Sequence, residues 1–226
     1  MKIAHVSDTH GQLWPEIPDE CDFVVHSGDG IPNASRGNLQ IEIPFQTKWI
    51  TDNIENYRKW LKGKTLLYCQ GNHCFIDACE VLNHHNIPAI DLTNKVIEHQ
   101  GIIFYGFPYI NYIAGEWNHE RLLQDLNNEM QYMKERIKEA GLGLDILVAH
   151  APPWGICDTY AGMHLGNSLL TNEITYQQLD PMPKHIFCGH IHEAGGFGEL
   201  FDVKISQAAT LVHVIEYDPE PIEDKS

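Results

Sequence analysis

The segment CGHIHEAGG, residues 188–196, places two histidines one residue apart among three glycines. Histidine is a common ligand for metal ions, because a neutral imidazole offers a nitrogen lone pair. Glycines beside it let the backbone turn tightly and approach a bound group closely. The spacing therefore favours a site in which His190 and His192 hold something between their side chains.

Four other short segments place polar side chains beside glycine or proline in the same way. They are residues 7–11 (SDTHG), 27–30 (SGDG), 70–73 (QGNH) and 150–153 (HAPP). Each segment alone has an ordinary structural explanation, since Asp8 could cap a turn and His150 could be a hydrogen-bonded histidine at a strand end. All five segments follow an apolar run, and this recurrence favours one shared site.

The apolar runs before these segments are predicted to be strands of an α/β protein. Short β-branched and apolar runs alternate along the chain with longer polar segments of helical character. The predicted strands span residues 2–7, 22–27, 65–70, 101–107, 144–150 and 184–189. Because the carboxyl ends of strands open into loops at one edge of an α/β sheet, the five segments are expected to meet in one crevice.

Helices and one further strand pair complete the predicted layers of helix and sheet. The predicted helices span residues 45–62, 76–86, 118–140 and 168–179. In the third helix an apolar stripe recurs at helical spacing, which we interpret as core packing; it consists of Leu122, Leu126, Met130, Met133 and Ile137. Residues 199–206 and 210–217 are predicted to pair as terminal antiparallel strands.

The donor atoms of the five segments suit divalent metal ions. The donors are two carboxylates, one amide and four imidazoles: Asp8, Asp29, Asn72, His10, His150, His190 and His192. Imidazole and carboxylate together favour manganese, which we expect first, or iron, zinc, nickel or cobalt. The absence of thiolates argues against a structural zinc site.

Seven ligands are too many for one ion and suit two ions that share a carboxylate. Two divalent ions carry four positive charges against the two negative charges of Asp8 and Asp29. The crevice is therefore expected to be locally cationic and to bind small anions. Two such ions can promote the attack of a metal-activated hydroxide on phosphorus.

Composition indicates one globular domain over residues 1–226, with 43% hydrophobic and 20% charged residues. The formal net charge of −16 opposes binding of long nucleic acids, which rests on Lys and Arg neutralising phosphates. Without a signal peptide or a run of about 18 apolar residues, the chain is expected to be cytoplasmic and to make no membrane contact. Six cysteines without paired zinc spacing are expected to be reduced and mostly buried.

The same segments resemble the calcineurin-like metallophosphoesterase superfamily. SDTHG, GDG, GNH, VAHAPPWG and CGHIHE follow the order of that family's motifs, with ligand positions from residue 8 to residue 192. DILVAHAPPWGICD, LGNSLL and FCGHIHEAGG are similar to the metallophosphoesterase-domain-containing group first described from brain. The resemblance implies a four-layer α/β/β/α sandwich.

The resemblance also implies how the ligands are divided between two metals. One metal would be held by Asp8, His10, Asp29 and His192, and the other by Asn72, His150, His190 and the bridging Asp29. His73 would lie near the leaving group, as the catalytic histidine of the family does.

Two positions depart from the family pattern. GNH is usually followed by an acidic residue that could orient the neighbouring histidine, but Cys74 follows here. After GD, residues 30–33 (GIPN) differ from those that usually shape the pocket. Neither change removes a ligand, so an active enzyme is expected.

Three residues are candidate substrate contacts. Trp154, just after HAPP, could stack on a base or pack across the Pro-Pro turn. Tyr109 and Trp117 belong to an aromatic loop whose family counterpart borders the pocket, and Tyr109 is the contact we select. Arg36, in the polar loop after GDG, is a candidate phosphate clamp.

Together these observations predict a phosphodiesterase that depends on two divalent metals. The resemblance implies a small diester as substrate, such as a cyclic or 2′,3′-cyclic nucleotide. The alternatives are a phosphomonoesterase, a metal-dependent nuclease and an inactive metal-binding scaffold. The net charge and the lack of a basic groove weigh against the nuclease, and the complete ligand set weighs against the scaffold. The oligomeric state is left open.

Overall fold

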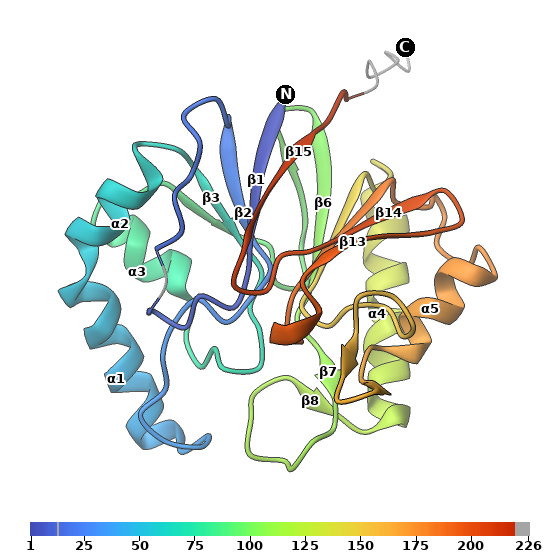
Figure 1. Ribbon diagram of the computed structural model, residues 1–226, viewed down its shortest axis with the longest axis horizontal. Helices are drawn as coiled ribbons and strands as arrows, with labels where there is room; N and C mark the ends of the chain where they lie inside the picture. Colours follow the sequence, from blue (N-terminus) through green and yellow to red (C-terminus); the bar gives the residue numbers. More distant parts are fainter. Residues whose placement is uncertain (13, 220–226) are drawn as a thin grey trace.

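The computed structural model describes residues 1–12 and 14–219, in which strands and helices alternate (Figure 1). One sheet contains β1 (Lys2–Val6), β2 (Phe23–His26), β3 (Leu66–Tyr68), β4 (Ala89–Asp91) and β15 (Val212–Glu216). The other contains β5 (Val96–His99), β6 (Ile102–Phe107), β9 (Ile146–Ala149), β12 (His185–Cys188), β13 (Gly196–Leu200) and β14 (Val203–Gln207). The helices are α1 (Leu39–Asp52), α2 (Ile54–Leu61), α3 (Ala78–His84), α4 (Leu123–Ala140) and α5 (Ser168–Thr175), with a short 3₁₀ helix η1 (His192–Ala194).

Both sheets are mainly parallel in their interiors. The strand order is β15-β1-β2-β3-β4 in the first sheet and β13-β14-β12-β9-β6-β5 in the second. The antiparallel strands β15, β13 and β5 lie at the edges. Two short pairs lie outside the sheets: β7 (Ile110–Asn111) with β8 (Glu120–Arg121), and β10 (Thr159–Tyr160) with β11 (Met163–His164).

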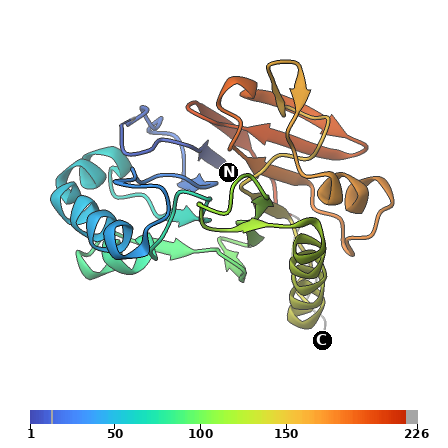
Figure 2. The ribbon, with the colours of Figure 1, turned by 90° about the horizontal axis from the view of Figure 1, so that it is seen from below.

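Neighbouring residues of one strand pack into different cores, because successive side chains point to opposite faces. In β1, Ile3 packs against the second sheet, whereas Ala4 packs under α1, α2 and α3. In β9, Ile146 packs against the first sheet, whereas Leu147 packs under α4 and α5. The helices thus cover the two outer faces of the paired sheets (Figure 2). The four-layer α/β/β/α sandwich implied by the resemblance is confirmed.

The boundaries of α4 show how side chains set an element. Four residues of the predicted core stripe, Leu126, Met130, Met133 and Ile137, are buried, but Leu122 is 57% exposed because it precedes the first turn of the helix. The helix ends at Gly141, which adopts a left-handed conformation that glycine tolerates. It begins at Leu123 rather than at residue 118, because the preceding residues form β8 against β7.

The single helix predicted at residues 45–62 is two helices in the structure. The first begins earlier because the Asn38 side chain accepts a hydrogen bond from the backbone N–H of Gln40. It ends where the Asn53 side chain donates back to the carbonyl of Trp49, and α2 follows at once. The other two helices, α3 and α5, lie within their predicted spans.

The predicted pairing of residues 199–206 with residues 210–217 is wrong. A turn at Phe201 and Asp202 divides the first segment, so that β13 and β14 pair with each other. The other segment, β15, crosses to the first sheet and pairs with β1, which buries Ile215 between the sheets. The alternating pattern predicted strands correctly, but the choice of partner depends on tertiary packing.

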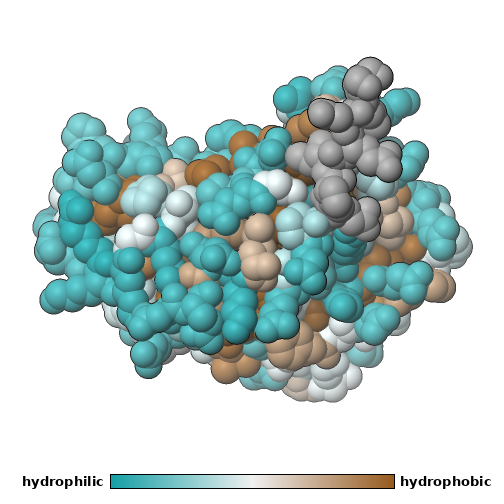
Figure 3. Space-filling view, turned by 90° about the horizontal axis from the view of Figure 1, so that it is seen from above, coloured by the Kyte–Doolittle hydropathy of each residue, from teal (hydrophilic) through white to brown (hydrophobic). Residues whose placement is uncertain are grey.

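All six cysteines are free, and five of them are buried. Within the described residues no helix is both long enough and apolar enough to span a lipid bilayer. Where described atoms are visible, the end of the molecule at which β1 begins is mostly hydrophilic, with small apolar spots (Figure 3).

Candidate metal centre

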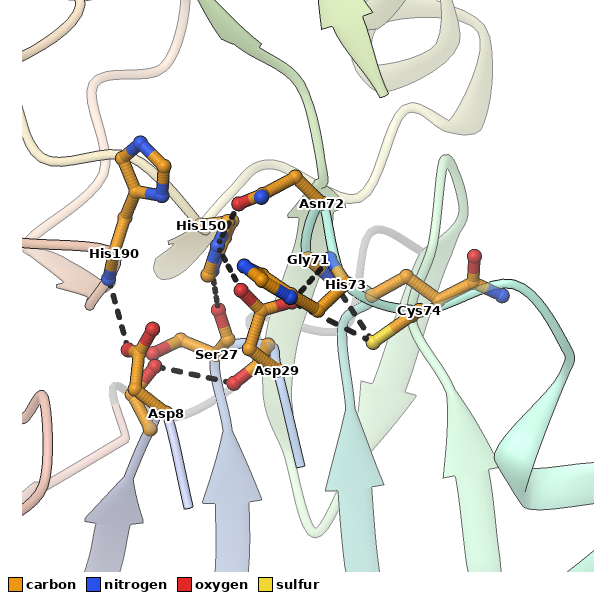
Figure 4. Close-up of polar contacts among 12 residues, drawn as sticks. Asp8, Ser27, Asp29, Gly71, Asn72, His73, Cys74, His150 and His190 are labelled. Carbon is orange, nitrogen blue, oxygen red and sulfur yellow. Dashed lines mark hydrogen bonds and ion pairs between the residues drawn. The ribbon is translucent and has the colours of Figure 1, made fainter. Parts of the chain in front are cut away.

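The loops that follow five parallel strands bring the predicted ligands together. The first three of these strands, β1, β2 and β3, end just before Asp8, Asp29 and Asn72. In the second sheet, β9 and β12 end just before His150 and His190. Side chains from both sheets converge at this end of the strands (Figure 4).

Two groups of potential ligand atoms are present among the described residues. In each group, all the atoms lie within 4.8 Å of one another: Asp8, His10 and His192 in one, and Asp29, His150 and His190 in the other. Asn72 adjoins the second group, with Oδ1 3.0 Å from Nε2 of His150. Asp29 belongs to the second group only, so its sharing between two ions stays a prediction.

The first group brings three donor atoms close together. Nε2 of His10 lies 3.2 Å from Nε2 of His192, which in turn lies 3.4 Å from Oδ1 of Asp8. This Asp8 oxygen is buried and has no hydrogen-bond partner. A buried, unpaired carboxylate oxygen is costly unless a cation or donor satisfies it. The residues therefore fit a metal ion.

In the second group, three acceptor atoms face one another. Nδ1 of His150 donates to the Ser27 carbonyl at 2.8 Å, so Nε2 of the neutral ring keeps its lone pair. Nε2 lies 3.1 Å from an Asp29 oxygen and 3.0 Å from the Asn72 oxygen. Three such atoms repel one another unless a proton or a metal lies among them.

The pKa values of His150, Asp29 and His190 agree with this arrangement. Although burial lowers the pKa of His150, the adjoining Asp29 carboxylate raises it to about 9, so that without a metal the ring holds a proton. The pKa of Asp29 lies well below its usual value because His150 outweighs the effect of burial. Burial lowers the pKa of His190 to about 4, which leaves this ring neutral with a free lone pair. Asp29 and His190 are thus deprotonated, as the ligands of a metal ion must be.

The backbone at the ligands is strained. Asp8, His10, Asp29 and His190 have φ angles of 53°, 46°, 58° and 70°, in the left-handed region that non-glycine residues rarely adopt. Such conformations persist where the surrounding structure fixes them, and they occur often at functional sites. A Cβ at Gly71 would overlap the Asp29 carboxylate, so only glycine allows this loop to approach it.

His73, the predicted catalytic residue, lies beside both groups and belongs to neither. Its backbone N–H donates to Oδ1 of Asp29 at 2.8 Å. Its ring centroid lies 4.9 Å from that of His10 and 4.1 Å from that of Trp117. Burial lowers the pKa of His73. The ring is therefore held next to the ligand groups without being one of the clustered donors.

Asn33 orients the His73 ring. The Asn33 amide nitrogen donates to the His73 carbonyl at 3.1 Å, and its oxygen lies 2.5 Å from Nδ1 of the ring. Because the oxygen is an acceptor, Nδ1 carries a proton and donates it to Asn33. Nε2 is then the nitrogen available to a ligand. Asn33 is one of the residues at which the sequence departs from the family pattern, and its contact supplies an orienting partner for His73.

The other departure, Cys74, is turned into the core below Asp29 (Figure 4). Its Sγ lies 3.1 Å from the Tyr68 hydroxyl and 3.8 Å from Oδ1 of Asp29. Burial raises the pKa of the Cys74 thiol to about 12, so it is neutral. A neutral thiol places no second negative charge against Asp29.

Sequence reasoning missed two polar residues on the buried face of α1. Gln46 donates to the His73 carbonyl at 2.7 Å and accepts from the backbone N–H of Phe75 at 2.8 Å. Glu42 accepts from the backbone N–H of Ser35 at 2.7 Å, in the loop that carries Asn33. Polar residues at i and i+4 of a buried helical stripe are the signal that could have revealed them.

A pocket of about 330 Å³ opens at the ligand groups. The polar side chains in its lining are Asp29, Asn72, His73, His190, His192 and Glu193. The other lining residues are apolar or aromatic: Ile113, Trp117, Tyr160, Leu165 and Ile191. Neither lysine nor arginine lines it in the part of the chain that the structure describes.

The three predicted substrate contacts do not line this pocket. Tyr109 is buried, and its hydroxyl accepts from the Asn94 amide at 2.8 Å. Trp154 is 48% exposed outside the pocket. Arg36 is exposed and its guanidinium lies 3.8 Å from a Glu116 carboxylate oxygen. Of the aromatic loop singled out in the sequence, Trp117 is the residue that reaches the pocket.

Comparison with known families adds independent evidence. The family described as calcineurin-like phosphoesterase matches residues 1–194, which is most of the chain. The chain belongs to the calcineurin-like phosphoesterase family. It is therefore a metal-dependent enzyme that hydrolyses phosphate esters. Its described residues include candidate ligand groups for two divalent ions.

Three individual relatives were found at low identity. An uncharacterized protein of Methanocaldococcus jannaschii is 26% identical, over 86% of this chain and 81% of its own length. The proteins named metallophosphoesterase domain-containing protein 1 of Homo sapiens and Mus musculus are both 25% identical, over 96% of this chain and 68% of their own length. The resemblance to the metallophosphoesterase-domain-containing group is confirmed.

Proposed function

We propose that this phosphoesterase is a phosphodiesterase for small diesters, with cyclic and 2′,3′-cyclic nucleotides as its substrate class. The charge of the pocket carries the proposal. Two divalent ions would bring four positive charges, against the carboxylates of Asp8, Asp29 and the exposed Glu193. The single positive charge left over matches the single negative charge of a diester, whereas a monoester carries up to two. No lysine or arginine of the described pocket lining would neutralise the second charge.

We propose the following division of the ligands. One ion is held by Asp8, His10 and His192, the other by Asn72, His150 and His190, and Asp29 contributes to both. The unpaired Asp8 oxygen and the acceptors around Nε2 of His150 support this division. When bound, the two ions supply a nucleophilic water and stabilise the charge on the phosphate oxygens. Manganese suits these nitrogen and oxygen donors and is our first choice.

The role proposed for His73 is protonation of the departing oxygen. Nδ1 keeps its proton in the bond to Asn33, so the ring acts as an acid in its imidazolium form, in which Nε2 carries a second proton and passes it to the departing oxygen. The Trp117 ring lies against one side of the imidazole and limits its movement. A poor leaving group such as a ribose hydroxyl needs this proton, whereas a nitrophenolate does not.

Both sheets are needed for such a site. Asp8, Asp29 and Asn72 follow strands of the first sheet, whereas His150 and His190 follow strands of the second. Neither sheet alone holds the ligands of either ion. We therefore propose that residues 1–226 act as one domain.

Two substrates with the same leaving group test the diester preference. The manganese-loaded protein should hydrolyse bis-p-nitrophenyl phosphate with a higher kcat/KM than p-nitrophenyl phosphate. Asp29→Ala is the matched control and should hydrolyse neither, which shows that the activity comes from this site. A clear preference for the monoester contradicts the proposal. Product analysis with 2′,3′- and 3′,5′-cyclic nucleotides then tests the substrate class.

A further inference from the structure

Two separate loops supply apolar and aromatic side chains that form two walls of the pocket. Ile113 and Trp117 belong to the loop between β7 and β8. Tyr160 lies in the β10–β11 hairpin, and Leu165 follows that hairpin directly. The walls therefore come from segments far apart in the sequence, one on each side of the motif that carries His150.

The Trp117 wall is held rigidly by one carboxylate. Glu120 is only 9% exposed, and its two oxygens accept four backbone hydrogen bonds of 2.7 to 3.0 Å. The donors are the N–H groups of Ile113, Ala114, Gly115 and Trp117. Asn118 ties the loop to the ligand loop by donating to the carbonyls of Asn72 at 3.0 Å and Cys74 at 2.6 Å. The indole is thus fixed before a ligand binds, which reduces the entropy lost on binding.

A second carboxylate organises the Tyr160 wall. Asp158 is buried, and one of its oxygens lies 2.6 Å from Nδ1 of His164 on the opposite hairpin strand. Its other oxygen accepts from the backbone N–H groups of Gly155 at 2.9 Å and Gly166 at 3.0 Å. These bonds fix the chain on both sides of the hairpin, while the Tyr160 side chain stays 47% exposed at the pocket.

Resting on the proposed function, we infer that Trp117 and Tyr160 stack on the planar groups of the diester. A cyclic nucleotide offers one such group, its base, whereas an acyclic diester offers two. In an acyclic diester Trp117 takes the group of the leaving alcohol, because its ring lies 4.1 Å from that of His73. Tyr160, on the other wall, takes the second group. Both residues offer flat aromatic faces, so the preferred groups are planar and aromatic. Stacking on such faces depends little on the identity of a base.

Binding of two inert diesters to the manganese-loaded protein tests this inference. Diphenyl phosphate and diethyl phosphate carry the same charge and differ only in their organic groups. By isothermal titration, diphenyl phosphate should bind about a hundredfold more tightly, which is about tenfold for each stacked ring and in the lower part of the range for aromatic stacking. Trp117→Ala and Tyr160→Ala should each weaken diphenyl phosphate binding about tenfold, and Trp117→Phe should restore most of the loss. Binding of diethyl phosphate should change little.

A matched control removes the same kind of side chain elsewhere. Tyr176→Ala alters a residue that is 67% exposed and lies outside the pocket lining. It should bind diphenyl phosphate as the wild type does. The inference is overturned if neither ligand binds, if both bind equally, or if the pocket variants lose no more than the control. Hydrolysis of bis-p-nitrophenyl phosphate, measured in parallel, tests the proposed function separately. Binding of diphenyl phosphate can be measured whether or not that hydrolysis occurs.

Discussion

At the residue scale, an amide orients His73, the proposed catalytic histidine, in a chain that lacks the acidic residue expected after GNH. Asn33 accepts from Nδ1 of His73 and also donates to the carbonyl of that residue, so its own orientation is fixed. An amide fixes the tautomer of the ring without placing a negative charge beside it. Cys74 likewise adds no charge next to Asp29. The negative charge near the ligands is thus confined to the ligands themselves and the exposed Glu193.

Substitution of His73 separates protonation from binding. His73→Ala should keep its metals and its fold, because the ring is in neither ligand group. It should lose about 10²- to 10⁴-fold in kcat on 2′,3′-cyclic AMP, the contribution typical of a positioned general acid. The loss on bis-p-nitrophenyl phosphate should be much smaller, and Asn33→Leu should show the same contrast at smaller size. Equal losses on both substrates would mean that His73 stabilises the phosphate and does not protonate the leaving group.

The pKa of His150 predicts a pH-dependent metal affinity. Without a metal, Asp29 raises this pKa to about 9 against the effect of burial, so the ring must release a proton before its Nε2 can bind an ion. His192, whose pKa Asp8 raises, acts in the same direction. Manganese affinity should therefore rise with pH, by up to about tenfold per unit for each proton released, and level off near pH 9.

Calorimetry in buffers of different ionisation enthalpy counts these protons. His190→Ala is the control, since a pKa of about 4 leaves that ring neutral and its removal should weaken binding without changing the proton count. The stability of the metal-free protein should show the opposite trend. The His150 imidazolium stabilises the fold fully below its unfolded pKa of 6.5, and this contribution is lost as pH rises through about 9. Proton-free metal binding near neutral pH would contradict this view of the site.

At the scale of elements, the strands and the segments after them could be predicted from the sequence. Apolar runs in the sequence predicted β1, β2, β3, β9 and β12. Because ligand sites form at the carboxyl ends of strands in α/β sheets, the residues after these strands were predicted to share one crevice. The start of α1 could not be read, because Asn38 caps a helix whose first turn exposes Leu39 and Ile41. The partner of β15 could not be read either, because both sheets offer it an apolar face.

The carboxylates that hold the pocket loops were beyond the sequence pattern. Glu120 and Asp158 act through hydrogen bonds to the backbone of loops that are irregular in shape. Such bonds depend on where each loop lies, and a motif records only residue types. The predicted substrate contacts lie outside the pocket lining for a related reason. Tyr109 and Trp117 share one aromatic loop, and only the fold decides that Tyr109 is buried and Trp117 faces the pocket.

Removal of the Glu120 carboxylate should loosen the loop that carries Trp117. Glu120→Ala leaves four backbone N–H groups without their acceptor, which should cost about 1–3 kcal/mol of unfolding free energy. Metal content should stay unchanged, KM should rise more than kcat falls, and amide exchange should accelerate at residues 113–117. Glu116→Ala, an exposed acidic residue of the same loop, is the control and should show none of these effects. Wild-type amide protection in Glu120→Ala would contradict this role.

At the scale of the whole molecule, the two sheets meet at a shared set of ligands. Each ligand group joins residues that follow strands of both sheets: Asp8 and His10 with His192, and Asp29 with His150 and His190. Metal binding should therefore stabilise the sandwich as a unit, by an amount that grows with the logarithm of free metal concentration. The net charge of −16 opposes the binding of long nucleic acids, which depends on Lys and Arg neutralising phosphates.

Metal content per chain tests the central claim most directly, because Asp29 is proposed to contribute to both ions and His192 to one. Protein prepared with manganese should contain about two ions per chain in the wild type, as expected for a dinuclear centre. Elemental analysis should find more metal lost from Asp29→Ala than from His192→Ala, with both variants still folded. An Asp29→Ala protein that retains about two ions per chain, or a metal-supplied wild type that contains none, would contradict the dinuclear centre.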